Sequence, residues 1–334
     1  MKGYALWAQF KRKLGLCFFA GLLAVPVVNI VADPYEVFGT GVLPFSSTSA
    51  NMRYLKLEQL EERPLDLLLI GSSVTQMIDP RWIVPGKESV FNLASFSVDT
   101  AALELMAREG VRHVKPGGNV VIGIDPALFL AVGDRGLAFK LPPEVSGVDR
   151  REWWKDYILA PSLQAVAYKV FGYFGPVNIE FDMEYGHYRL LKWDAEMERE
   201  PLSYQKKKFN TKEVAKMGPF IEDPVGISRI ERLAAVLEDS EVVVTWVLMP
   251  VHPLMRAHIG EDHLFRLYDA VALAVSKARK PARVVDLRDH FITRDDGFWY
   301  EHRHFAPAGA KMVAAEIRSA MESRVLGALL DEKR

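Results

Sequence analysis

The feature of the sequence that most constrains the fold is an apolar run, residues 67–70, that ends abruptly in Gly71, Ser72 and Ser73. Consecutive apolar residues without alternation are typical of a central strand in a parallel sheet that is covered on both faces. We expect Gly71 to permit the turn that follows the strand. Because ligands of open α/β sheets bind at the carboxyl ends of strands, Ser73 is a candidate nucleophile. The alternative is that one of these serines only caps the next helix.

The chain after residue 65 alternates between strand and helix patterns. Strands are predicted at about residues 65–71, 89–93, 120–124, 241–249 and 283–287, a turn at 115–119, and helices at about 100–110, 226–238, 261–279 and 307–330. Strands that alternate with helices indicate right-handed crossovers and a mostly parallel sheet. The predicted fold is therefore α/β, with three layers (α/β/α) and a mostly parallel five-stranded sheet.

The N-terminus carries an apolar stretch, residues 14–32, without a charged residue. Its 19 residues would cross about 28 Å of hydrocarbon as a helix. Basic residues precede it and acidic residues follow it: Lys2, Lys11, Arg12, Lys13, then Asp33 and Glu36. The positive-inside rule therefore predicts a cytoplasmic tail at residues 1–13, a transmembrane anchor at 14–32 and an extracytoplasmic main domain. A cleaved signal peptide is the main alternative, but Ile30 is bulky where cleavage needs a small residue. The second alternative is that residues 14–32 form a buried N-terminal helix of a soluble protein.

The remaining residues divide into a connecting segment at 33–64 and a main domain at 65–334. This domain contains an insertion at about 131–225 that breaks the strand and helix rhythm. The insertion is rich in aromatic residues: Trp153, Trp154, Tyr157, Tyr168, Phe171, Tyr173, Phe174, Tyr185, Tyr188 and Trp193. We expect it to form either a lid or partner surface over the sheet edge, or a small core of its own.

Composition excludes several classes of function. The 42 basic and 43 acidic residues balance to a net charge of −1, so nucleic acid is not an expected partner. The single cysteine, Cys17, allows neither an internal disulfide nor a cysteine-based zinc site. No His-Glu-x-x-His motif accompanies the neighbouring His302 and His304, and no glycine-rich phosphate loop is present. We therefore expect neither a metal nor a cofactor.

A candidate base lies near the C-terminus. Pro307 is well placed to open the last helix, so His304 is expected on the loop before it. Glu301 precedes His304 by three residues, a spacing that lets a carboxylate hydrogen-bond Nδ1 of the imidazole. This bond would leave Nε2 free to accept the proton of a serine hydroxyl. With Ser73 these residues make a set of nucleophile, base and orienting carboxylate.

Four sequence blocks carry a resemblance to a known family. They are Gly71-Ser72-Ser73 with Thr75, Asn92-Leu93-Ala94, Gly123-Ile124-Asp125, and Glu301-His302-Arg303-His304-Phe305. In this order, across residues 65–310, they resemble the blocks of SGNH (GDSL-like) hydrolases and acyltransferases. The N-terminal anchor followed by Asp33-Pro34-Tyr35 is similar to bacterial membrane-anchored extracytoplasmic members, some of them related to O-acetylation of exopolysaccharides.

The resemblance implies roles for particular residues. Ser73 would be the nucleophile, His304 the base and Glu301 its orienting group, where the family usually has aspartate. The oxyanion would be held by the Ser73 amide, a second-block amide and a third-block asparagine side chain. The sequence departs from this pattern at two positions, with Ser97 near where the family often has glycine and Asp125 in place of the asparagine.

These departures bear on the expected oxyanion and substrate-lining residues, which are Ser97, Asn92, Asp125 and His252. An ionised Asp125 would repel an oxyanion and would help only if burial kept it protonated. Alternatively, Asn92 is a structural turn residue and Asp125 caps a helix. His252, which follows the strand at 241–249, lines the same edge or is a satisfied loop histidine.

Two hypotheses of function follow. The first is a membrane-anchored extracytoplasmic serine esterase or O-acyltransferase in the inner membrane. It would act on an acylated glycan or envelope polysaccharide through an acyl-serine, with a membrane acyl-transfer protein as a further expected partner. The second is a catalytically inactive SGNH-like scaffold that binds glycan or an assembly partner, and Asp125 is its main support. They differ in whether Ser73 reacts.

Overall fold

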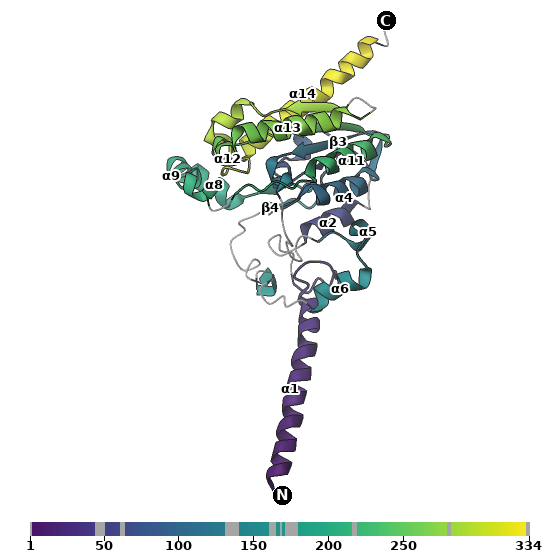
Figure 1. The fold of residues 1–334 in the computed structure, drawn as a ribbon, viewed down its shortest axis with the longest axis vertical. Coiled ribbons are helices and arrows are strands. Elements are labelled where there is room, and N and C mark those ends of the chain that lie inside the picture. Colours follow the sequence, from purple (N-terminus) through teal and green to yellow (C-terminus); the bar gives the residue numbers. More distant parts are fainter. Residues whose placement is uncertain are drawn as a thin grey trace. The chain divides into compact units, whose positions relative to one another are not determined.

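The computed structural model describes residues 2–43, 51–60, 64–130, 140–159, 165–167, 169–170, 180–215, 219–278 and 282–331. The chain forms two compact units, one made of Met1–Leu55 with Gly136–Pro176 and the other of Lys56–Arg135 with Val177–Arg334 (Figure 1). The predicted insertion at about 131–225 is thus divided between the units. Four of its aromatic residues, Tyr168, Phe171, Tyr173 and Phe174, lie outside the described residues.

The second unit contains a five-stranded parallel sheet in the order β2-β1-β3-β6-β7. The strands are β1 (Leu65–Ile70), β2 (Val90–Asn92), β3 (Val114–Ile124), β6 (Val243–Leu248) and β7 (Arg283–Asp286). The main helices are α4 (Thr100–Val111), α11 (Gly226–Glu238), α13 (Glu261–Ser276) and α14 (Pro307–Asp331). Helices cover both faces of the sheet (Figure 1). The predicted three-layer α/β/α fold is confirmed.

Strand β1 shows why its sequence does not alternate. Leu67 and Leu69 belong to the core that includes the buried residues of α14. On the opposite face, Leu68 and Ile70 lie against Gly110 of α4. All four strand residues are fully buried, as expected where helices cover both faces of a parallel sheet.

The turn predicted at residues 115–119 takes a different form. Leu65 pairs with Val114 and Leu67 pairs with Asn119, so the intervening residues of β3 bulge out opposite a single residue of β1. Gly117 supports this bulge with a φ of +75°, a conformation that side chains with a Cβ rarely adopt. The prediction of a turn before the strand was wrong because the strand resumes on both sides of the bulge.

Gly71 is required for close packing, and its φ does not lie in the left-handed region. A Cβ at this position would lie 2.3 Å from Oγ1 of Thr75 and 2.9 Å from the carbonyl oxygen of Gly123. The absence of a side chain lets the end of β1 approach both the first turn of α3 (Ser73–Gln76) and the end of β3. This approach brings the residues that follow the two strands close together.

The strand order places these two strand ends at a special position. From β1 the chain crosses to β2 on one side, and β3 returns to the other side of β1. Ligands of doubly wound sheets bind at such a switch point, outside the carboxyl ends of the strands. Ser72 and Ser73 follow β1 there, and Asp125 follows β3.

Shorter elements complete the second unit. They are η1 (Pro80–Trp82), η2 (Pro126–Phe129), β4 (Glu180–Phe181), β5 (Tyr188–Arg189), α8 (Leu191–Arg199), α9 (Pro201–Lys208), α10 (Thr211–Ala215), α12 (Pro253–Ile259), η4 (Phe291–Arg294) and η5 (Asp296–Phe298). Strands β4 and β5 form an antiparallel hairpin. Tyr185, Tyr188 and Trp193, from the predicted insertion, pack on the core beside α14.

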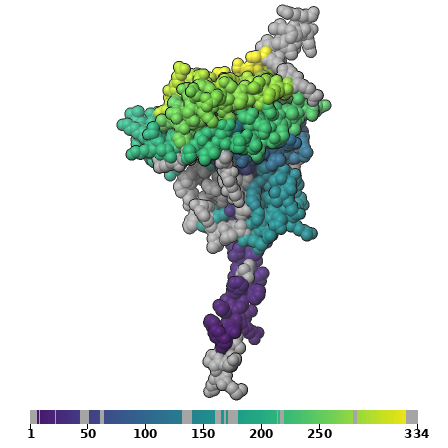
Figure 2. All heavy atoms as spheres, in the orientation of Figure 1, coloured from purple at the N-terminus to yellow at the C-terminus, as the bar shows by residue number. Residues whose placement is uncertain are grey.

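The first unit begins with α1 (Lys2–Ala32) and includes α5 (Pro143–Ser146) and α6 (Arg150–Leu159). Its aromatic residues Trp153 and Tyr157 form a cluster with Val37, against which Tyr35 and Phe38 pack. Within the described residues, one helical stretch, Gln9–Ala32, is long and apolar enough to cross a membrane, a test that a signal sequence also passes. Figure 2 shows the described part of α1, in purple, uncovered on the face in view.

Candidate active site

The structure brings Ser73 and His304 together across 231 residues of sequence. Ser73 is the first residue of α3, and its Oγ lies 2.8 Å from Nε2 of His304. His304 lies on the loop before α14, and this loop is closed by the bridge between Trp299 and Phe305. Both residues are partly exposed, so the pair is not sealed inside the core.

Glu301 holds the other side of the imidazole. Its Oε1 lies 2.5 Å from Nδ1 of His304 and also accepts a hydrogen bond from the His304 amide at 3.1 Å. Burial of Glu301 acts to raise the pKa of the carboxyl, but the hydrogen bond and the positive charge of His304 outweigh it and lower the pKa to about 2. Nearby Arg303 and His302 contribute in the same direction. Glu301 is therefore ionised at any pH where the protein would work.

Asp125 lies near the nucleophile, but its carboxylate is hydrogen-bonded to other groups. Its Oδ2 accepts a hydrogen bond from Oγ of Ser72, and its Oδ1 accepts one from the Ala127 amide at 2.9 Å. Asp125 thereby caps η2, and Ser72 caps α3 by accepting a hydrogen bond from the Val74 amide at 3.2 Å. Both capping alternatives of the sequence analysis are present.

Burial raises the pKa of Asp125 to about 6, although the hydrogen bonds from Ser72 and Ala127 and the charge of His304 act to lower it. The side chain is only 2% exposed. At neutral pH Asp125 is thus mainly ionised and offers no hydrogen-bond donor. Asp125 could help an oxyanion only if it were protonated, and burial does not raise its pKa far enough for that at neutral pH.

Asn92 has a structural role, and the expectation that it lines the site is corrected. Its side-chain nitrogen donates to the carbonyl oxygens of Thr75 at 2.9 Å and Ile78 at 2.7 Å. Its Oδ1 accepts from the Ala94 amide at 3.0 Å. Because both N–H groups of this fully buried amide are used, no donor remains for an oxyanion.

The second-block loop lies beside the histidine. The ring of Phe96 is 6.3 Å from the ring of His304 and 4.7 Å from that of Tyr188, measured between centroids. Ser97, the next residue, is exposed and has a φ of +56°. Side chains with a Cβ rarely adopt this left-handed region, which favours glycine.

His252 does not reach the triad, which corrects its assignment as a substrate-lining residue. Its Nε2 lies 2.8 Å from Oδ1 of Asp296, and its Nδ1 accepts from the Leu254 amide at 3.2 Å. The ring packs between Phe209 and Trp299, and the side chain is 3% exposed. Burial lowers the pKa of His252 despite the raising effect of Asp296. It is a satisfied loop histidine.

A buried lysine near the candidate site cannot be identified from the sequence. Lys56 is fully buried, and its Nζ donates to the carbonyl oxygen of Ala94 in the second-block loop. Burial lowers the pKa of Lys56 well below its usual value. Lysine side chains are usually exposed, so nothing in the sequence around Lys56 indicates that it is buried against this loop.

The geometry has a defined chemical capacity. A serine hydroxyl, a histidine nitrogen and an ionised carboxylate form one hydrogen-bonded line, the arrangement that activates serine in acyl transfer. In the part of the chain that the structure describes, no group of three His, Cys, Asp or Glu side chains is arranged to hold a metal ion.

Comparisons with known proteins add little to this description. No protein-family model matches the chain, and no curated protein matches it. Among solved structures, one described as "a putative platelet activating factor from Streptococcus pneumonia" is similar, with a TM-score of 0.39 and 10% sequence identity, over 80% of this chain and 89% of that chain. A likeness at this level carries no argument about activity.

The raised pKa of Asp125 predicts a pH-dependent stability. The pKa rises from 3.8 to about 6 on folding, so the stability present below pH 4 is lost as the pH rises through about 6. Between pH 4 and pH 7 the wild type should lose roughly 2–3 kcal/mol of unfolding free energy relative to Asp125→Asn. Denaturant unfolding at both pH values measures this. Asp262→Asn, at an exposed carboxylate, is the control: it keeps Asp125 and should follow the wild type. A difference between wild type and Asp125→Asn that stays constant with pH would contradict the assignment.

Proposed function

We propose that this chain is a serine esterase or O-acyltransferase of the SGNH type that acts on an acylated glycan outside the cytoplasmic membrane. The observation that carries the proposal is the line of hydrogen bonds from Ser73 through His304 to Glu301, with distances of 2.8 Å and 2.5 Å. A fully exposed serine without a base would not support it, because the free hydroxyl is a weak nucleophile.

The first half of the reaction transfers an acyl group to Ser73. Its Oγ attacks the ester carbonyl carbon while Nε2 of His304 takes the hydroxyl proton. Glu301 stabilises the imidazolium that forms and keeps the ring oriented. The tetrahedral intermediate collapses to the acyl-serine, and the departing alcohol takes the proton from His304.

The second half returns the enzyme to its starting state. A water molecule or a sugar hydroxyl attacks the acyl-serine, and His304 removes its proton. The bond between Ser73 Oγ and the acyl carbon breaks, and Oγ recovers the proton from the imidazolium. Water as acceptor gives hydrolysis, and a sugar hydroxyl gives O-acyl transfer.

Stabilisation of the oxyanion relies on backbone amides in this proposal. The Ser73 amide lies in the first turn of α3, where amides have no partner within the helix. The loop at Phe96 and Ser97 supplies the second amide. Without a side-chain donor at Asp125, we expect a rate lower by about 10²–10³ than in an enzyme with a complete set of donors.

The membrane part of the proposal rests on α1. Several described apolar side chains of this helix are more than half exposed, among them Phe18, Phe19 and Leu23. Burial in lipid would remove this apolar area from water. The basic residues before the helix and the acidic ones after it favour a retained anchor with the catalytic unit outside the cytoplasm.

A serine-directed fluorophosphonate tests the catalytic proposal. We expect one phosphonyl adduct on Ser73, found by peptide mapping, and no adduct in Ser73→Ala. Replacing His304 by alanine should slow labelling by at least about 10³-fold, because the general base is lost.

The matched control is His258→Ala on α12, which should label within about twofold of the wild-type rate. Folded wild-type protein that is not labelled, or is labelled at another serine, would refute the enzymatic proposal. The non-catalytic scaffold would then be the better account.

The anchor makes a separate prediction. In a bacterial host the full chain should remain in the membrane fraction after alkaline carbonate extraction. Protease added outside the inner membrane should digest residues after Asp33, because the main domain lies on that side. Mature protein that starts after residue 32, or protein protected from this protease, would contradict the proposed topology.

A further inference from the structure

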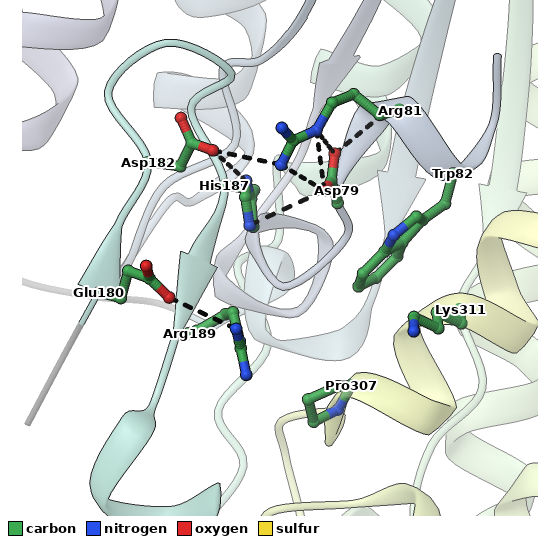
Figure 3. A pocket seen from close by; sticks show the side chains of 9 residues that line it. All are labelled: Asp79, Arg81, Trp82, Glu180, Asp182, His187, Arg189, Pro307 and Lys311. Atoms are coloured by element: carbon green, nitrogen blue, oxygen red, sulfur yellow. Dashed lines mark hydrogen bonds and ion pairs between the residues drawn. The ribbon is translucent and has the colours of Figure 1, made fainter. Parts of the chain in front are cut away.

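A hollow of about 270 Å³ lies in the second unit, outside the hydrogen-bonded triad. Three segments enclose it: η1 with Asp79 before it, the β4–β5 hairpin, and the start of α14 (Figure 3). Its volume is just below the ~300–1,000 Å³ typical of sites for drug-sized ligands. It therefore has room for a small ring compound.

The hollow adjoins the triad through two elements. Pro307, in its wall, follows His304 by three residues, so their Cα atoms lie within about 11 Å. In β5, Tyr188 packs on Phe96 beside His304, whereas Arg189 lines the hollow. Neighbouring residues of a strand point to opposite sides, so the hairpin separates the two sites by a single layer.

One wall of the hollow is a fixed polar network. Asp79 accepts three hydrogen bonds from the Arg81 side chain at 2.7–3.0 Å. Arg81 also donates to Asp182 at 3.3 Å and lies 4.1 Å from the ring centre of Tyr185. The carboxylates of Asp79 and Asp182 are thus held in place by Arg81. They can also accept hydrogen bonds from neighbouring hydroxyls of a ligand, because each carboxylate oxygen accepts more than one hydrogen bond.

His187 belongs to the same wall, and its imidazole does not use all of its hydrogen-bonding groups. Its side chain is 8% exposed, and its nitrogens lie 3.5 Å from Asp182 and 4.0 Å from Asp79. Its buried Nδ1 makes no hydrogen bond within the described residues. Burial lowers the pKa of His187 despite the two nearby carboxylates, so the ring is neutral and offers one donor and one acceptor.

The opposite wall is an aromatic surface. Trp82 is partly buried, and Nζ of Lys311 lies 5.3 Å from its ring centre. In Figure 3 Trp82 and Lys311 stand across the hollow from Glu180 and Arg189. An indole face opposite carboxylates and guanidinium groups matches a pyranose ring, which has an apolar C–H face and a rim of hydroxyls.

The charges of the lining residues select among ligands. Three carboxylates (Asp79, Glu180 and Asp182) face three cations (Arg81, Arg189 and Lys311), and His187 is neutral. Most of them are already paired: Arg189, for example, lies 3.5 Å from Glu180 and 3.2 Å from Asp194. A balanced lining gives no net attraction to a phosphate or a polyanion. It favours an uncharged, hydroxyl-rich ligand.

We propose that this hollow binds one sugar ring of a neutral glycan and so holds the glycan beside Ser73. The inference rests on the proposed serine chemistry and narrows its glycan substrate to a neutral one held at this hollow. Trp82 stacks on the ring, and Asp182 and His187 hydrogen-bond its hydroxyls.

Titration calorimetry of the full chain in detergent micelles tests the proposal. The probes are three neutral hexasaccharides (xylohexaose, cellohexaose and mannohexaose) and one acidic one, hexagalacturonate. At least one neutral probe should bind, and more tightly than hexagalacturonate. Trp82→Ala should weaken that binding at least about tenfold, because the stacking surface is lost.

Two further variants make the test specific. Asp182→Asn keeps the shape of the side chain and should also weaken binding, by about fivefold or more. Phe291→Ala removes an aromatic ring that is 50% exposed and lies outside the hollow, and it should bind within about twofold of wild type. Thermal unfolding identifies any variant that fails to fold.

The proposal is overturned if no neutral hexasaccharide binds, if binding persists in folded Trp82→Ala and Asp182→Asn, or if hexagalacturonate binds most tightly. Labelling of Ser73 by a fluorophosphonate needs no glycan. Labelling without glycan binding therefore overturns this inference alone, and glycan binding without labelling overturns the proposed reaction alone.

Discussion

The hydrogen bond between Oγ of Ser73 and Nε2 of His304 is the contact on which the account of this protein depends. It joins residues 231 positions apart, and the sheet makes the contact possible. Strand β1 delivers the serine to the switch point of a parallel sheet, and the closed loop before α14 delivers the histidine to the same edge. Gly71 allows the close packing that this requires, because a Cβ would meet both Thr75 and the backbone of Gly123. The close packing at Gly71 is thus needed both for the fold at this sheet edge and for the contact between Ser73 and His304.

Charge around this contact is controlled by burial and by hydrogen bonds. Glu301 stays ionised next to the base because His304 donates to it, while buried Asp125 has a raised pKa close to the nucleophile. Two carboxylates near one serine therefore have different roles, one orienting the base and the other capping η2 and holding Ser72. Their environments, rather than their residue type, make the difference.

The sequence predicted those parts of the structure that local patterns determine. The unbroken apolar run at residues 67–70 indicated a strand covered on both faces, and the three-residue spacing of Glu301 and His304 indicated their hydrogen bond. The pairing of Ser73 with His304 was expected from their residue types and positions, but other contacts that depend on tertiary packing could not be predicted. The carbonyls that occupy the Asn92 amide come from a different segment, the partner of Asp125 is the serine preceding the nucleophile, and His252 turns toward Asp296. Composition and spacing do not show which polar groups of different segments will meet.

The measurement that tests the central claim most directly is the rate at which a fluorophosphonate modifies Ser73 in Glu301→Gln. Glutamine keeps the shape of the side chain but removes the charge that stabilises the imidazolium and fixes its tautomer. A triad that works through His304 predicts a rate lower by about 10²–10⁴-fold in protein that is still folded. A rate within about threefold of wild type would contradict the account, because the carboxylate would then be a structural neighbour of the histidine only.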